Sequence, residues 1–238
     1  MPAPARFPSG VTTVAQTDPL GNFGLPDPTK WHVWFDDFDD YAATDWVITT
    51  TEAGAGSATE AASSADGGVL VITNDNADND NDFFQWAGVD SSAVIETWKF
   101  VSGKRLFFKT RFKVSDATDS DFVIGLQITD TTPLAVTDGV YFRKDDDDAN
   151  LDFVVIKDSA ATTATAFATA ANDTYMELAF VYDGKSGIEY YKDGVKYGTA
   201  ALTNLPDDEE LTISFGIQNG AAAAKVMSID YIFVAKER

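Results

Sequence analysis

The chain has 238 residues, of which 45% are hydrophobic and 13% aromatic, so it carries enough apolar surface to fold and is not a disordered segment. Its 38 acidic residues against 17 Lys and Arg give a formal net charge of −21, which repels phosphate backbones and anionic lipids and so argues against nucleic acid and membrane surfaces as partners. Cysteine is absent, as expected for a protein made in a reducing cytoplasm. The start lacks the apolar run of a secretory signal, and no segment approaches the ~20 apolar residues of a membrane span.

Six of the eight prolines fall in the first 28 residues. Because proline fixes φ and removes a backbone donor, we expect residues 1–33 to form an extended arm and residues 34–238 to form one domain. Residues 1–35 are neutral, so the excess charge belongs to the body. The arm has too many apolar residues for a solvent linker, and we expect it to lie across its own body or on a partner. Its predicted contact residues are Arg6, Phe7, Pro8, Val11, Val14, Leu20, Phe23, Leu25 and Trp31.

From residue 34 onward the apolar residues recur with period two or in short runs bounded by Gly, Asn or Asp, which is typical of an all-β sandwich or barrel. The Ala-rich segments 57–65 and 160–171 are expected to be loops or ragged edge strands. No repeat of fixed period is present, which disfavours a propeller or solenoid. The expected strands are 46–52, 68–74, 83–89, 105–116, 121–130, 139–145, 151–158, 174–183, 188–194, 211–219 and 225–237.

Two of these segments predict how their strands are buried. Phe108 and Phe112 should face the core while Lys109, Arg111 and Lys113 face outward, because side chains alternate across a strand. The segment DFVIGLQI is apolar on both faces in part. It therefore predicts a central strand whose outer face is covered by a loop or by a neighbouring chain.

The runs FFKTRFKVSDATDSDFVIGLQITD, MELAFVYDGKSGIEYYKDGVKYGT, LTISFGIQNG and SIDYIFVAKE, in this order, resemble concanavalin A-like lectin and glucanase jelly rolls, including laminin-G-like domains. The hairpin with its DG turns and the final strand with its Ile-Asp-Tyr triplet carry the resemblance. It implies an all-β, two-sheet antiparallel jelly-roll sandwich with an extended N-terminal arm, covering roughly residues 35–238.

The Pro-rich start RFPSGVTTVAQTDPLGNFGLPDPTKWH followed by WFDDFDDY resembles structural proteins of tailed bacteriophages. This resemblance implies a non-enzymatic capsid decoration protein that docks by its arm on the major capsid protein or another virion protein and displays an acidic jelly roll outward. It also implies a location on the capsid surface after synthesis in the host cytoplasm. Capsid symmetry favours a trimer or dimer.

Groups for catalysis are scarce in the sequence. Jelly-roll glucanases place two working carboxylates on one strand as E-x-D-x-x-E, and this triplet does not occur; Glu177 and Glu237 lack the spacing. His32 is the only histidine, so a triad, a zinc site or a Cys nucleophile cannot be assembled, and His32 is expected to pack or hydrogen-bond. We predict no catalytic residues, no cofactor and no metal.

The acidic runs NDNADNDND (74–82) and KDDDDAN (144–150) contain oxygen ligands suited to calcium. Neither run has the glycine that an EF-hand loop needs, so solvated loops are the favoured interpretation. If a cation does bind, the expected ligands are Asp78, Asp80 and Asp82.

The alternative function is a carbohydrate-binding module for host or environmental glycans, and a divergent glycan-cleaving enzyme is less favoured. Tyr190 and Tyr191 are adjacent on an expected strand, so at least one should face outward, and both are predicted as glycan contacts. The wider set of candidates for a sugar-stacking platform is Trp46, Trp86, Trp98, Tyr141, Tyr190, Tyr191 and Tyr197.

Overall fold

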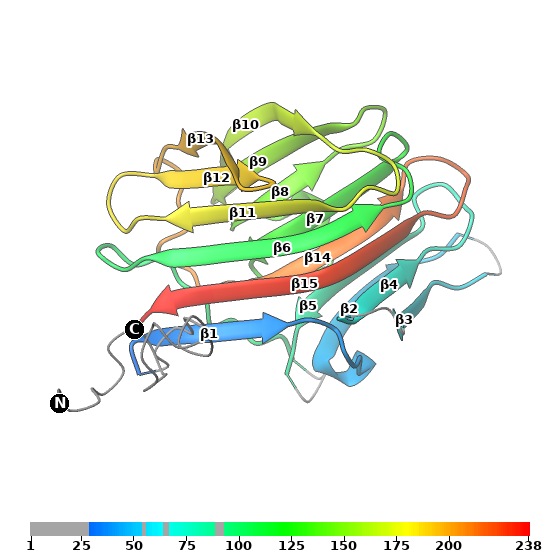
Figure 1. The fold of residues 1–238 in the computed structure, drawn as a ribbon, viewed down its shortest axis with the longest axis horizontal. Coiled ribbons are helices and arrows are strands. Elements are labelled where there is room, and N and C mark those ends of the chain that lie inside the picture. Colours follow the sequence, from blue (N-terminus) through cyan, green and yellow to red (C-terminus); the bar gives the residue numbers. More distant parts are fainter. Residues whose placement is uncertain (1–28, 54–55, 64–66, 89–92) are drawn as a thin grey trace, which may run out of the picture.

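A computed structural model describes residues 29–53, 56–63, 67–88 and 93–238. They form two antiparallel sheets that face each other as a jelly-roll sandwich, as the sequence predicts (Figure 1). Sheet A has the order β13-β12-β11-β6-β15-β4-β3, with β1 also paired to β15, and sheet B has the order β10-β9-β8-β7-β14-β5-β2. The strands are β1 (Trp31–Asp36), β2 (Trp46–Thr51), β3 (Thr59–Ser63), β4 (Val69–Thr73), β5 (Asn81–Trp86), β6 (Leu106–Val114), β7 (Ser120–Gln127), β8 (Gly139–Lys144), β9 (Asn150–Lys157), β10 (Ala160–Thr169), β11 (Met176–Tyr182), β12 (Ile188–Lys192), β13 (Val195–Ala200), β14 (Thr212–Asn219) and β15 (Val226–Glu237).

Helical structure in the described residues is limited to two 3₁₀ turns, η2 (Ala43–Asp45) and η3 (Pro133–Ala135). Within these residues no helix has the length and apolar character needed to cross a bilayer. The chain ends of the described part lie close together, because the backbone N–H of Arg238 donates to the carbonyl of Lys30.

The main core fills the space between the two sheets. Alternation along β6 is complete, with Phe108 and Phe112 buried and Lys109, Arg111 and Lys113 on the outer face, which confirms the predicted pattern. At one end of the core the ring of Trp46 on β2 lies against several aromatic rings from both sheets. These neighbours are Trp34, Phe38, Phe84, Trp86 and Phe215.

The outer face of sheet B is also buried at its centre. Every residue of β7 is buried, and the loop 128–138 lies over the outer face of β5, β7, β8 and β9. Gln85 and Gln127 on the sheet donate side-chain hydrogen bonds to carbonyls of this loop, at Ile128 and Pro133. Of the two covers expected for this central strand, the loop is therefore the one observed.

Four strands lie outside the segments expected to be strands. β3 and β10 coincide with the Ala-rich segments and are edge strands, which was one of the two alternatives for them. β13 pairs with β12 at the edge of sheet A, and β1 pairs with the second half of β15 from Trp31 to Asp36. The predicted boundary between arm and body, after residue 33, therefore falls inside β1, and Trp31 belongs to the sandwich.

Candidate functional site

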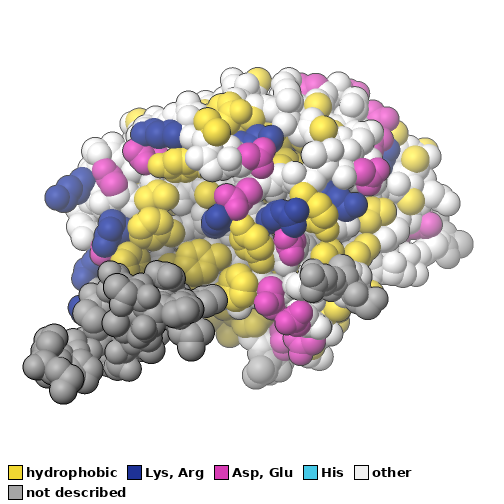
Figure 2. Space-filling model, in the orientation of Figure 1, with side chains coloured by type: hydrophobic (Ala, Val, Ile, Leu, Met, Phe, Trp, Pro, Cys, Tyr) yellow, Lys and Arg dark blue, Asp and Glu magenta, His cyan; other side chains and the backbone are white. Residues whose placement is uncertain are grey.

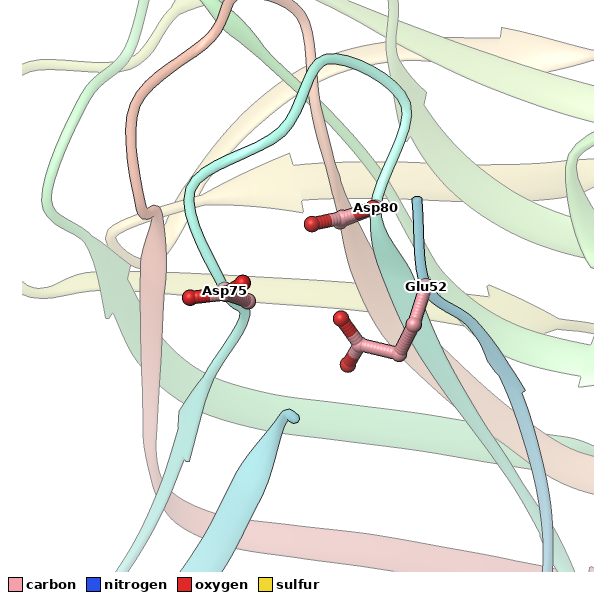
Figure 3. A group of neighbouring side chains, drawn as sticks. All are labelled: Glu52, Asp75 and Asp80. Carbon is pink, nitrogen blue, oxygen red and sulfur yellow. The ribbon is translucent and has the colours of Figure 1, made fainter. Parts of the chain in front are cut away.

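Three carboxylates converge at one end of the sandwich. Glu52 follows β2, Asp75 follows β4, and Asp80 precedes β5, and one oxygen from each lies within 4.8 Å of the others. Figure 3 shows the three side chains directed toward a common space between the two loops. They converge because β2 and β5 are paired from Trp46–Trp86 to Thr51–Asn81, so the residues beyond the end of this ladder lie side by side.

Hydrogen bonds from the backbone hold two of these carboxylates in place. Asp80 accepts from the backbone N–H of Ala53 at 2.6 Å and of Ala77 at 3.0 Å, which ties the β2–β3 loop to the β4–β5 loop. Glu52 accepts from the backbone N–H of Ala58 at 2.5 Å through one oxygen, while its other oxygen is buried and has no hydrogen-bond partner. These bonds use only part of the acceptor capacity of the group.

A fourth carboxylate, Asp82, lies further inside. It faces the interior of the sandwich on β5 and accepts a hydrogen bond from the hydroxyl of Thr50 on β2. Burial raises the pKa of Asp82 to about 7, and the nearby carboxylates of Glu60 and Glu52 raise it as well, although the Thr50 hydroxyl acts in the opposite direction. The end of the sandwich therefore gathers acidic groups from both sheets.

For the run 74–82 the sequence favoured a solvated loop, and it named Asp78, Asp80 and Asp82 as ligands only if a cation binds. Asp80 and Asp82 were among the expected ligands, and the structure buries both, whereas Asp78 is exposed and lies outside the group. Glu52 and Asp75 were not predicted. Asp75 belongs to the same acidic run, but Glu52 lies far from it in sequence and only the strand register brings it close.

A second acidic group lines a hollow of about 200 Å³ on the outer side of sheet B, beside β9 and β10. Its carboxylates come from Asp145, Asp148 and Asp152. Arg143 forms ion pairs with Asp145 at 3.0 Å and with Asp152 at 3.4 Å, so its single positive charge is shared by two of the three carboxylates. Burial raises the pKa of Asp145, although the Arg143 guanidinium opposes the increase.

The two tyrosines predicted to contact glycans differ in position. Tyr190 is 9% exposed and its ring stacks on Phe153 in the core, so it presents no free face to a sugar and the expectation for Tyr190 is corrected. Tyr191 lies on the outer face of β12, and its hydroxyl donates to Glu189. Among the wider platform candidates Trp46, Trp98 and Tyr141 are buried, Trp86 is half-buried, and Tyr197 on β13 is exposed.

His32 packs, as expected. Its ring lies 4.4 Å from that of Trp98, centroid to centroid, on the inner side of β1. Burial lowers the pKa of His32, and the positive charges of Arg238 and Lys236 lower it further. The side chain is therefore neutral at pH 7 and part of the packing between β1 and the segment before β6.

The outer face of sheet A carries an apolar patch beside the start of the described chain, which we call the β1 face. Val33 and Phe35 on β1 are 38% and 56% exposed, and the ring of Phe35 lies 6.4 Å from that of Tyr231 on β15. Figure 2 shows hydrophobic side chains gathered over β6, β15 and β1. The β1 face consists of Trp31, Val33, Phe35, Phe107, Tyr231 and Phe233.

Of the nine predicted arm contacts, Trp31 lies on the β1 face, where its ring is 5.6 Å from that of Phe107 and the Arg105 guanidinium lies over it at 5.3 Å. The other eight, Arg6, Phe7, Pro8, Val11, Val14, Leu20, Phe23 and Leu25, lie outside the described residues.

No protein-family model and no curated protein matches this sequence. Solved structures with the same fold do match. The endo-beta-1,3(4)-glucanase SCLam of family GH16 aligns with a TM-score of 0.60 at 15% identity, over 89% of this chain and 93% of the glucanase. A protein of unknown function from Shewanella oneidensis MR-1 aligns with a TM-score of 0.58 at 18% identity, over 87% of each chain.

The carbohydrate recognition domain of Emp46p, in its potassium-bound form, aligns with a TM-score of 0.55 at 9% identity, over 83% of this chain and 93% of that domain. The chain thus has the concanavalin A-like jelly-roll fold, which is shared by carbohydrate-binding lectins and glycoside hydrolases. At these identities the likeness concerns the fold alone, because one fold hosts many functions.

Proposed function

We propose that this protein is a non-enzymatic structural component of a bacteriophage virion, a capsid decoration protein that attaches through its N-terminal segment and the adjoining β1 face. The observation that carries the proposal is the exposed apolar surface of Val33, Phe35 and their neighbours, which begins where residues 1–28 join the sandwich. Exposed apolar patches of this kind mark surfaces that bind other proteins.

The surroundings of the β1 face resemble the rim of a protein interface. Arg105 pairs with Glu237 at 2.7 Å along its border, and Arg111 pairs with Asp230. Apolar centres surrounded by polar, paired groups are common at stable interfaces. The net charge of −21 lies on the body, so an attached copy would present an acidic surface to solvent, which keeps particles apart.

Two features of sheet B support a non-enzymatic role. The loop 128–138 fills the centre of its outer face with Leu134 and Val136, so this part of the sheet offers no open groove to a substrate. In the neighbouring hollow, Arg143 pairs with both Asp145 and Asp152, and a carboxylate held by a guanidinium is a weaker nucleophile than a free one.

The test compares two matched double variants of the full chain, Val33→Ser/Phe35→Ser on the β1 face and Val195→Ser/Tyr197→Ser on the distant β13. Purified protein is mixed with particles that lack it, and the copies bound per particle are counted after sedimentation. We expect the β1-face variant to lose at least tenfold in apparent affinity while the β13 variant binds as the parent does. Equal binding by the parent and both variants would refute attachment through this face.

The expected partners are the major capsid protein or another virion protein, and the expected free state is a dimer or trimer, which sedimentation equilibrium of the full chain measures. Carbohydrate binding is the second candidate function. It is favoured by the exposed Tyr197, whose ring lies 5.5 Å from that of Phe167. Titration with soluble glucans tests it, and here the β13 variant is the one expected to lose binding.

A further inference from the structure

Five acidic residues gather at one end of the sandwich, which we call the acidic end. Asp80 and Asp82 face inward from sheet B, and Glu60 lies opposite Ile72 on the edge strand of sheet A. Glu52 and Asp75 complete the group at the mouth of this end. In the described part of the chain, no Lys, Arg or His forms an ion pair with any of these five residues.

Two oxygen atoms at this end of the sandwich are deeply buried and receive no hydrogen bond from the protein. Asp82 is 0% exposed and no donor group reaches its Oδ2, although its carboxyl group is close enough to that of Glu60 to share a hydrogen bond with it. Asn74 is 2% exposed, and its Oδ1 has no partner. Both belong to this end of the sandwich, because Asp82 interacts with Glu60 and Glu52, and the Asn74 amide donates to the carbonyl of Asp80 at 2.9 Å. Buried acceptors normally have a partner, since desolvation without one costs about 1–3 kcal/mol.

The unpartnered atoms are concentrated here. Of the seven buried side-chain atoms without a partner in the described residues, four belong to this group and its immediate neighbours. One of the four is the hydroxyl of Tyr41. The carboxylates of Glu60 and Asp82 are close enough to this hydroxyl to raise its pKa. The four are Tyr41 Oη, Glu52 Oε2, Asn74 Oδ1 and Asp82 Oδ2.

We propose that this end of the sandwich binds one Ca²⁺ ion through the carboxylates of Glu52, Asp75 and Asp80, next to the buried side chains of Asp82 and Asn74. Ca²⁺ bonds to oxygen are 2.3–2.6 Å long, so two oxygens on opposite sides of one ion are roughly 4.8 Å apart. The three carboxylate oxygens lie within 4.8 Å of one another, so all three can reach one such ion.

The chemistry of the ligands selects the kind of ion. All of the donors are carboxylate or amide oxygens, which suit hard cations, and no histidine or cysteine is available for zinc or copper. The three carboxylates come from two loops, Glu52 from the β2–β3 loop and Asp75 and Asp80 from the β4–β5 loop, so their geometry can adapt to the irregular coordination that Ca²⁺ accepts and Mg²⁺ does not. The ion would tie the β2–β3 loop to the β4–β5 loop across the mouth of the sandwich.

The experiment is calorimetric titration of the chelator-treated full chain with CaCl₂ at pH 7.5, together with thermal unfolding with and without the ion. We expect one saturable site and a melting temperature raised by several degrees, because the ion binds the folded state. Glu52→Gln and Asp75→Asn, each of which keeps the size of the side chain, should weaken Ca²⁺ binding about tenfold or more by removing a charged ligand.

Asp78→Asn is the matched control, because Asp78 is exposed in the same loop and lies outside the group. It removes the same charge and should leave the Ca²⁺ affinity unchanged. A melting temperature that rises equally with NaCl of the same ionic strength, or an equal loss of affinity in Asp78→Asn and Asp75→Asn, would show general screening and overturn the proposal. So would a flat titration of the parent chain.

Discussion

The ammonium of Lys225 lies 2.6 Å from the carboxylate of Asp116, so the residue before β15 is joined to the loop after β6. Lys225 is buried, and the Asp116 carboxylate also accepts hydrogen bonds from the backbone N–H groups of Thr118 and Asp119. We expect Asp116→Asn to lower the free energy of unfolding by about 1–3 kcal/mol, because it leaves a buried ammonium without its counter-charge. Urea denaturation at pH 7 measures the change, and an unaltered midpoint would contradict it.

The same pair predicts how stability depends on pH. Burial alone would raise the pKa of Asp116, but Lys225 and the two backbone donors outweigh it and lower the pKa from 3.8 to about 2. A carboxylate with a lowered pKa in the folded state stabilises the fold above its unfolded pKa, and this contribution disappears as the pH falls from about 4 to about 2. The free-energy difference between the parent and Asp116→Asn should therefore shrink over this range. A difference that stays constant from pH 5 to pH 2 would rule this out.

Trp46 is predicted to be the most costly aromatic residue to remove at its end of the core. Its ring contacts Trp34, Phe84 and Phe215 among others, so Trp46→Ala would leave a large cavity between the sheets. We expect a loss of about 3–5 kcal/mol. Val195→Ala, on an exposed strand residue, is the control and should change the free energy of unfolding by less than about 0.5 kcal/mol. Similar values for the two variants would be inconsistent with this packing.

Gly125 on β7 is predicted to tolerate no side chain. A Cβ atom at this position would lie 2.5 Å from the Cα atom of Tyr141 on the paired strand β8. Because the nearest atom belongs to the backbone, the strands themselves would have to separate, and we expect Gly125→Ala to cost about 1–3 kcal/mol. Thermal unfolding checks this, and a parent-like melting temperature would show that β7 and β8 can move apart at this position without cost.

Much of the fold follows from local pattern. β6 and β11 alternate between buried and half-exposed residues along their whole length, which is the signal of a strand with one face in the core. β3 and β10 carry Ala, Thr and Ser with little apolar contrast, so their pattern could not separate an edge strand from a loop. β1 was missed because both of its faces are apolar, with Trp34 inside and Phe35 outside, and the adjacent prolines suggested an arm.

The acidic site could be predicted only in part. The run 74–82 supplied Asp80 and Asp82, but composition does not show which carboxylates of a run turn inward. Glu52 is brought to them by the pairing of β2 with β5, and the register of two distant strands is set by the packing of the whole sandwich. The β1 face could not be predicted for the same reason. Phe107 on β6 and Phe233 on β15 lie near Val33 only because β15 pairs with both β1 and β6.

The edge strand β10 is irregular, and this limits how it can pair with a strand of another molecule. Its register breaks between Ala164 and Ala168, and Ala166 adopts a φ of 50°, in the left-handed region. A broken ladder cannot template a continuous strand from another molecule. Copies brought to high local concentration are therefore kept from fusing sheet to sheet along this edge into fibres, and remain separate folded units there.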